Sequence, residues 1–210
     1  MAKALAKELN FVYVDTGAMY RAAALFFMKE GLLANNEIDE KKIGQSLERM
    51  YIGFKYNPKS EEREIHLGGI NVEKEIRSME VAKKVSLVAT IPEVRRKLVD
   101  LQQRLAQDGG VVMDGRDIGT VVLPGAEVKF FITADPEVRA TRRLNELQEN
   151  GVEAQYDEIL GNIMERDRID SNRAVAPLKK AEGAIVLDNS ELTIDEQFQF
   201  LLSKVQQTIG

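Results

Sequence analysis

Short apolar segments alternate with stretches of helical periodicity along most of the 210 residues of this chain. The apolar segments are FVYV (11–14), GGVVMDG (109–115), EVKFFITA (127–134) and AIVLD (184–188). Strands that are apolar on both faces and separated by helices are typical of a parallel sheet covered by helices on both sides. We therefore predict an α/β fold built on a three-layer parallel sheet.

Helical periodicity and helix-terminating residues predict the helices of this fold. We expect them at 2–9, 18–31, 36–50, 78–88, 92–107, 136 to about 168, and 193–207. Asp135 and Pro136 suit the N-cap and the first position of the helix that begins at 136. The polar residues that follow this helix, through Asn172, are expected to form a loop.

Between the helices predicted at 36–50 and 78–88, the sequence pattern changes from helical to strand-like. YIGFKYN (51–57), EREIHLG (62–68) and GINVEKEI (69–76) are short, alternating and separated by turn residues. This pattern predicts a small antiparallel sheet inserted into the α/β fold, with His66 as a surface residue of the insert. No linker divides the chain, so residues 1–210 are expected to form one domain.

The composition excludes several kinds of chemistry. The chain has no cysteine and one histidine, which excludes disulfides, thiolate ligands and cysteine nucleophiles and argues against a histidine zinc site or a Ser-His-Asp triad. Its net charge of -5 argues against nucleic-acid binding. No apolar run approaches the ~20 residues of a membrane span, and no signal core follows the N-terminus. We expect a cytoplasmic protein.

Polar, glycine-bearing residues follow three of the predicted strands, at 15–17, 114–117 and 133–135. Ligands of parallel sheets bind beyond the carboxyl ends of the strands, so these residues are candidates for a site, although strand ends are polar in most folds. Gly115 and Gly119 let the backbone approach a ligand closely. Between them, Arg116 can bind phosphate and Asp117 can accept hydrogen bonds from an exocyclic amine, unless the two pair on the surface.

Arginines gather in one part of this acidic chain. Six lie between 139 and 173, and Arg139, Arg142 and Arg143 share one face of a predicted helix. Their like charges repel weakly unless an anion compensates, and the planar guanidinium suits phosphate oxygens. A solvated helix face is the alternative interpretation.

Six segments carry a resemblance to a known family. They are VDTGAMYRA, EIRSMEVAKKVSLVATIPEVRRKL, VVMDGRDIGTVV, VKFFITADPEVRATRR, ERDRIDSNRAVAPL and AIVLD. In this order and spacing, they resemble the signature segments of bacterial cytidylate kinases across residues 1–210. The resemblance implies a nucleoside monophosphate kinase fold of the P-loop type, with a CMP-binding insert at approximately 35–95 and an arginine-rich lid at approximately 145–175.

The resemblance also implies an activity and its ligands. The family transfers a phosphoryl group from ATP to CMP or dCMP, giving CDP or dCDP, with Mg²⁺. The expected partners are therefore these small nucleotides, without nucleic acid or membrane, and we expect a monomer. No protein ligand for a metal is assigned.

The resemblance implies which residues line the monophosphate and base sites. Thr16, Gly17, Tyr20 and Arg21 would line the monophosphate site, with Arg21 on the phosphate. Ser86, Arg95 and Asp117 would bind the cytosine, beside Gly115. The chemistry agrees, since cytosine presents an N4 amine to a carboxylate whereas uracil presents an acceptor. Tyr20 and Ser86 could instead be ordinary helix-packing residues.

The remaining residues implied by the resemblance handle phosphate and ribose. Arg116 and Arg173 would hold phosphate, and Asp170 the ribose hydroxyls. Arg142 and Arg166 would contact ATP or the transferring phosphoryl group. These four arginines are the expected catalytic residues.

One element of the family is missing from the sequence. The family normally opens with a buried strand and a G-x-x-x-x-G-K-[ST] loop, and none of the 210 residues forms such a loop. We expect the chain as written to be inactive, and favour a miscalled start or a truncated sequence over a natural variant without the loop. The alternatives are a non-catalytic remnant that binds CMP, or a kinase of similar fold with another small substrate.

Overall fold

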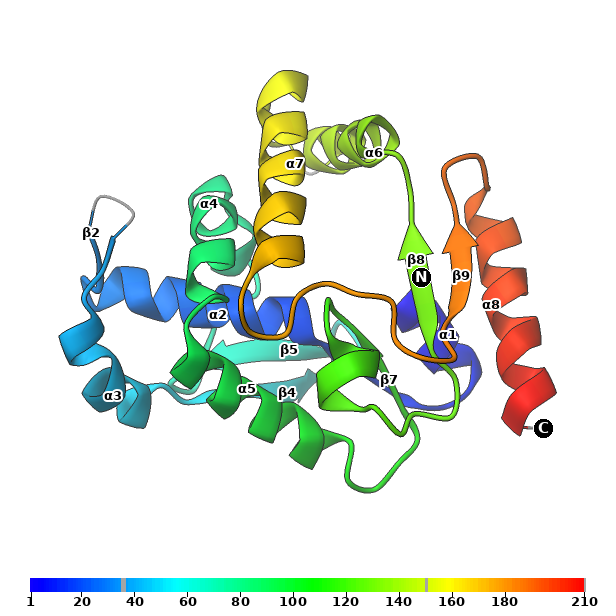
Figure 1. Cartoon of the computed structure of the whole chain (residues 1–210), viewed down its shortest axis with the longest axis horizontal. Coiled ribbons are helices and arrows are strands. Elements are labelled where there is room, and N and C mark those ends of the chain that lie inside the picture. The colour runs from blue at the N-terminus through cyan, green and yellow to red at the C-terminus, as the bar shows by residue number, and fades with distance from the viewer. Residues whose placement is uncertain (35–36, 150, 210) are drawn as a thin grey trace. The chain divides into compact units, whose positions relative to one another are not determined.

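The computed structural model describes residues 1–34, 37–149 and 151–209. It is a mixed α/β protein with parallel strands and helices, as predicted (Figure 1). The chain divides into two units, which we describe separately. Unit 1 comprises Met1–Leu9 and Arg116–Gly210, and unit 2 comprises Asn10–Gly115.

Unit 2 is built around a parallel strand pair and the helix that follows its first strand. β1 (Val12–Asp15) pairs with β7 (Val111–Asp114), so that Asp15 lies opposite Asp114. α2 (Thr16–Lys29) begins directly after β1, because the Asp15 carboxylate accepts a 2.8 Å hydrogen bond from the backbone of Ala18. The Thr16 hydroxyl donates to the Asp114 carbonyl at 2.6 Å and thereby joins the ends of both strands.

The apolar core of unit 2 surrounds α2. Met19, Ala22, Ala23 and Phe27 of this helix are fully buried. The helix packs against α4 (Met79–Val88) and α5 (Pro92–Leu105), and α3 (Glu40–Arg49) packs on α5. All of these helices were predicted.

The helix predicted at 36–50 begins later than expected. β2 (Leu33–Ala34) and β3 (Glu37–Ile38) form an antiparallel pair, and the helix starts only at Glu40. The amide of Asp39 donates to the carbonyl of Leu32, which extends this pairing in place of a helical turn. Asn36 lies outside the described residues.

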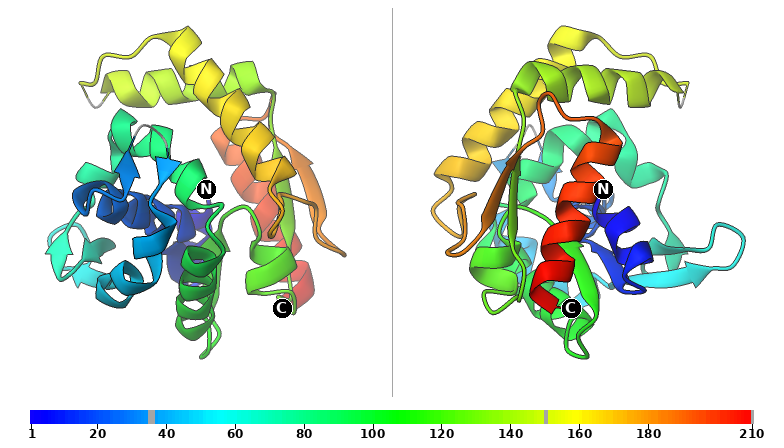
Figure 2. Two further views of the ribbon diagram at one scale, coloured as in Figure 1. Left: turned by 60° about the vertical axis from the view of Figure 1, so that its left-hand side comes forward. Right: turned by 90° about the vertical axis from the view of Figure 1, so that its right-hand side faces the viewer.

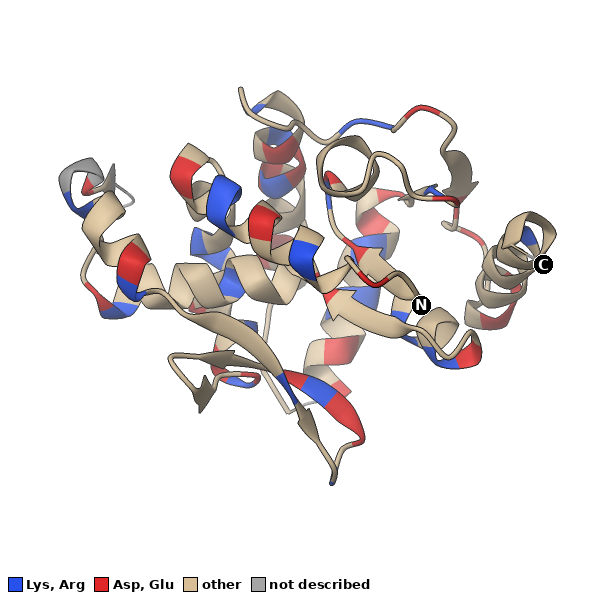
Figure 3. Ribbon diagram, turned by 90° about the horizontal axis from the view of Figure 1, so that it is seen from below, with Lys and Arg blue, Asp and Glu red and all other residues tan. Residues whose placement is uncertain are grey.

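The predicted antiparallel insert is confirmed. β4 (Ile52–Asn57), β5 (Glu62–Leu67) and β6 (Ile70–Asn71) form one three-stranded sheet, and the β4–β5 hairpin carries charges of both signs (Figure 3). The prediction of a strand through 76 was wrong, because the chain turns into the 3₁₀ helix η1 (Glu75–Arg77). The amide of Ile76 there donates to the carbonyl of Val72.

Unit 1 combines a second parallel pair with a helical hairpin. β8 (Phe130–Thr133) pairs with β9 (Ile185–Asp188). The single helix predicted from 136 to about 168 is instead two helices, α6 (Pro136–Glu149) and α7 (Tyr156–Asn172), which pack against each other, as Figure 2 shows. α1 (Ala2–Glu8) packs on α8 (Ile194–Ile209). A π-helical turn, η2 (Ile118–Val122), follows Asp117.

The loop predicted before Arg173 is instead the last turn of α7. The amide of Arg173 donates to the carbonyl of Ile169, and the Asn172 side chain donates to the carbonyl of Arg168. Asp170 would end a helix if its carboxylate competed for backbone amides. That carboxylate is buried against arginines, so the helix continues through it.

The parallel strands form two sheets of two strands among the described residues, β1–β7 in unit 2 and β8–β9 in unit 1. Each of these strands therefore has one hydrogen-bonded neighbour in the ranges that the structure describes. Across the same ranges, no helix is long and apolar enough to cross a membrane.

The Tyr13 hydroxyl gives the β1–β7 pair a dependence on pH. It donates to a carboxylate oxygen of Asp114 at 3.1 Å, and burial, followed by the charges of Asp114 and Asp15, raises the pKa of Tyr13 well above its ordinary value of 10.0. The unfolded chain ionises this tyrosine near pH 10 whereas the folded chain retains the proton. The stabilisation is therefore complete below about pH 10 and is lost as the pH rises above it.

We expect Tyr13→Phe to remove the loss of stability that ionisation of Tyr13 causes at alkaline pH. Urea unfolding at about pH 7 should show a loss of about 1 kcal/mol from the missing hydrogen bond. The free energy of unfolding should then fall less steeply above about pH 10 than in the unmodified protein. Tyr56→Phe is the matched control, because Tyr56 is largely exposed. Parallel pH profiles for all three proteins would contradict the prediction.

Candidate functional site

Three arginines surround one buried carboxylate in unit 1. Asp170 lies in the last turn of α7, and its side chain is only 3% exposed. Its oxygens lie 3.2 Å from Nε of Arg116, 3.4 Å from Nη1 of Arg173 and 3.7 Å from Nε of Arg166. A second carboxylate, that of Asp117, lies 3.9 Å from Nη2 of Arg173. We call these five residues the arginine cluster.

Helix geometry and the end of β7 together explain the arginine cluster. Arg166 is four residues before Asp170 and Arg173 is three after it, so the helix places all three side chains on one face. Arg116 and Asp117 come directly after β7 and its following glycine. The structure therefore brings together five of the residues that the sequence singled out.

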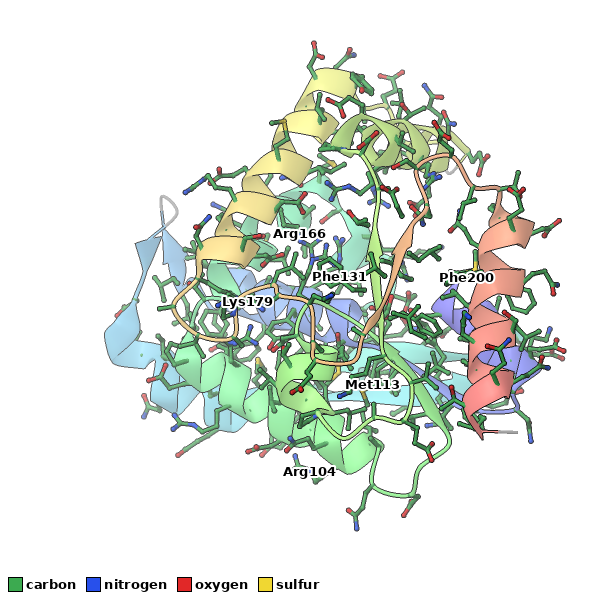
Figure 4. All side chains as sticks on the ribbon, turned by 45° about the vertical axis from the view of Figure 1, so that its right-hand side comes forward. Arg104, Met113, Phe131, Arg166, Lys179 and Phe200 are labelled. Atoms are coloured by element: carbon green, nitrogen blue, oxygen red, sulfur yellow. The ribbon has the colours of Figure 1, made fainter. Side chains whose placement is uncertain are left out.

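The charges of the arginine cluster favour an anionic ligand. Three guanidinium groups and two carboxylates leave a net charge of +1. Arg173 and both carboxylates are almost fully buried, where electrostatic interactions are stronger than in water. Arg116 is 38% exposed, so part of the cluster is accessible to solvent. Figure 4 labels Arg166 on α7, and its guanidinium adds a planar donor that suits phosphate oxygens.

The arginines of α6 have partners of their own. Arg142 donates to the side-chain and backbone oxygens of Asn189, at 3.0 and 2.7 Å, and so holds the segment between β9 and α8. Arg139 pairs with Asp167 at 2.6 Å, and Arg143 pairs with Glu146 at 2.7 Å. These contacts offset the repulsion expected along this face, and none joins Arg142 to the arginine cluster.

A second group of predicted residues lies in unit 2. Arg95 of α5 is 3% exposed, donates to the Ala89 carbonyl at 3.2 Å and lies 5.6 Å from the ring centre of Tyr20. Ser86 of α4 is also buried. Tyr20 thus supports the guanidinium of Arg95 by a cation–π contact, a role that its sequence position did not reveal.

The start of α2 carries the other predicted residues of unit 2. Thr16 uses its hydroxyl hydrogen to bridge the strand ends, as described above. Gly17 lies beside the Asp15 carboxylate, and a Cβ there would be 3.2 Å from an oxygen of that group. Arg21 follows one turn later and is half-buried, and Gly115 is the last residue of unit 2.

Sequence reasoning missed the segment that follows α7. The carbonyl of Ala176 accepts a 2.6 Å hydrogen bond from Nε of Arg173, and the amide of Leu178 donates to the carbonyl of Asp170 at 2.7 Å. The only signal was Pro177, because a proline restricts the residue before it and marks a turn.

The fold and the arginine cluster define the class of protein first. It is an α/β protein in which three arginines surround a buried aspartate of one helix. Among the residues that the structure describes, no group of three or more acidic or histidine side chains could hold a metal ion.

Comparisons with known proteins then give the family. The Cytidylate kinase family model matches residues 1–207. The chain is 50% identical over its whole length to the cytidylate kinase of Parabacteroides distasonis, of which it covers 92%. It is also 49% identical to that of Porphyromonas gingivalis and 47% identical to that of Flavobacterium johnsoniae, covering 91% of each. The chain belongs to the cytidylate kinase family.

Proposed function

We propose that this protein transfers a phosphoryl group from ATP to CMP or dCMP, giving CDP or dCDP. The observation that carries the proposal is the arginine cluster, in which three guanidinium groups lie around two buried carboxylates and part of the cluster is open to solvent. Such a site suits a ligand that bears both phosphate and hydrogen-bond donors. The names of the relatives support the same substrate.

Each polar residue of unit 1 has a chemical role in this proposal. Arg116 and Arg173 bind phosphate, and the Asp170 carboxylate accepts hydrogen bonds from the ribose hydroxyls. Asp117 accepts from the N4 amine of cytosine and repels O4 of uracil. Arg166, with Arg142, neutralises the transferring phosphoryl group or ATP.

The predicted residues of unit 2 also have chemical roles in this proposal. Arg95 and Ser86 donate to N3 and O2 of cytosine, and Arg95 can do so because Ala89 and Tyr20 hold its guanidinium in place. Arg21 binds the monophosphate, with Thr16, Gly17 and Tyr20 beside it and Gly115 close to the base.

Catalysis in this proposal comes from positioning and charge neutralisation. Phosphoryl transfer needs little covalent help from the protein, so aligned substrates and neutralised oxygens supply most of the rate. This agrees with a site that has many arginines and no cysteine or histidine. The lid, approximately 145–175, excludes the water that would compete with CMP. The family uses Mg²⁺ with ATP, and we assign it no ligand among the described side chains.

The 210 residues printed here should bind CMP without transferring phosphoryl. They contain no glycine-lysine loop, whose backbone amides and lysine hold the ATP phosphates in enzymes of this type. The first alternative to the proposed kinase is a non-catalytic remnant that binds CMP and transfers no phosphoryl group. A kinase of similar fold for another small substrate is the second alternative. We further propose a cytoplasmic monomer.

Titration calorimetry and a CDP assay on the purified chain test this proposal. We expect CMP to bind at least about tenfold more tightly than UMP or AMP, because one base-reading pair contributes about 1–3 kcal/mol. We expect no CDP after incubation with ATP and Mg²⁺. Tighter binding of UMP or AMP would reject the cytidylate assignment, and CDP formation would reject the need for the loop.

A further inference from the structure

A non-glycine residue with left-handed backbone follows the arginine cluster. Ala176 has φ 49°, a conformation that side chains with a Cβ rarely adopt. Pro177 comes next, and the residue before a proline favours an extended backbone. Two local preferences thus oppose the conformation of Ala176, so tertiary contacts must hold it.

Two hydrogen bonds join this turn to Arg173 and Asp170 of the arginine cluster. The left-handed turn presents the Ala176 carbonyl to Nε of Arg173, at 2.6 Å. Two residues later, the Leu178 amide donates to the backbone carbonyl of Asp170 at 2.7 Å. The chain therefore folds back on the end of α7 and is held there at both residues.

The same segment packs on the turn that carries Asp117. A Cβ added to Gly119 would lie 3.0 Å from Cβ of Ala181, so the Ala181 methyl group occupies the space that a side chain at 119 would need. Gly119 belongs to η2, which begins directly after Asp117. Residues 174–181, in which Figure 4 labels Lys179, thus contact both the end of α7 and the turn that follows Asp117.

We propose that Ala176 is a positioning residue for Arg173. With Nε bonded to the Ala176 carbonyl, the guanidinium plane is fixed, and Nη1 and Nη2 are directed at Asp170 and Asp117. A guanidinium with a fixed plane binds phosphate oxygens without losing further side-chain freedom. This inference rests on the proposed role of Arg173 in phosphate binding.

The test compares substitutions that differ in their tolerance of the left-handed backbone. Ala176→Val disfavours it, because valine is β-branched, whereas Ala176→Gly permits it. Glu61→Val is the matched control, since Glu61 has φ 56° in the exposed β4–β5 turn of unit 2. It introduces the same strain in an exposed turn outside the arginine cluster. Ala176→Leu replaces the valine variant if that protein does not fold.

The first measurement is hydrogen exchange of the Arg173 Nε–H by NMR, with the signal assigned by its loss in Arg173→Lys. We expect exchange about tenfold faster in Ala176→Val and unchanged in Ala176→Gly and Glu61→Val. The second is calorimetry with CMP and with cytidine, which lacks the phosphate. We expect Ala176→Val to weaken CMP binding about tenfold while the affinity for cytidine stays constant.

The outcomes separate this inference from the proposed function. Unchanged exchange in Ala176→Val, or equal effects of Ala176→Val and Glu61→Val, would overturn the role of Ala176. Equal weakening of CMP and cytidine would overturn it as well, because a general disturbance of the site affects both. If the unmodified chain binds no CMP, the proposed function fails, and the Nε–H exchange alone decides whether Ala176 positions Arg173.

Discussion

Asp170→Asn is expected to lower the free energy of unfolding by about 3 kcal/mol, because it leaves buried positive charge without its main partner. Asparagine keeps the volume of the side chain, so packing is preserved. Asp117, which lies 3.9 Å from Arg173, remains as the second carboxylate of the arginine cluster. Urea unfolding at neutral pH measures the loss.

Inorganic phosphate should restore part of this stability. An anion that binds the folded variant but not the unfolded chain stabilises it by mass action. We therefore expect phosphate, added at constant ionic strength, to stabilise Asp170→Asn more than the unmodified protein. Asp167→Asn is the matched control on the same helix, because its pair with Arg139 is partly exposed and should contribute no more than about 1 kcal/mol. A loss as small as that of the control, or no response to phosphate, would contradict an anion site at Asp170.

Asp117→Asn is expected to reduce the preference for CMP over UMP by about tenfold or more. The carboxylate accepts from the cytosine amine and repels uracil O4, whereas the asparagine amide can also donate to O4, and such a base-reading contact contributes about 1–3 kcal/mol. Calorimetric affinities for the two nucleotides measure the change. Asparagine is preferable to alanine here, since Asp117 is buried beside Arg173 and a cavity would also destabilise the site.

Arg173→Lys provides the contrast to this variant. Lysine keeps the charge but cannot form the planar, bidentate contact, so CMP and UMP should both bind more weakly by a similar factor. If Asp117→Asn also weakened both nucleotides equally, Asp117 would be a structural partner of Arg173 and would not read the base.

The positions of most helices and strands could be predicted because they depend on local patterns. The apolar runs that become β1, β7, β8 and β9, and the alternation within the β4–β5 hairpin, are visible within a few residues. Two of the errors lie where contacts with other segments overrule local preference. Residues 37–38 pair with 33–34 and do not begin a helix, and residues 169–172 remain helical because arginines neutralise Asp170.

The sequence by itself determined the α/β class, the family, and the arginines and aspartates that are candidates for the site. These follow from periodicity and from motifs in a fixed order. Only the tertiary structure decided that Arg116, 54 residues from Asp170, meets it with Arg166 and Arg173. It also decided that Tyr20 supports Arg95 and that Ala176 takes a left-handed backbone. The physical reason is that local sequence preferences either oppose these arrangements or carry no information about them. The arrangements become favourable only when packing brings residues that are distant in sequence into contact.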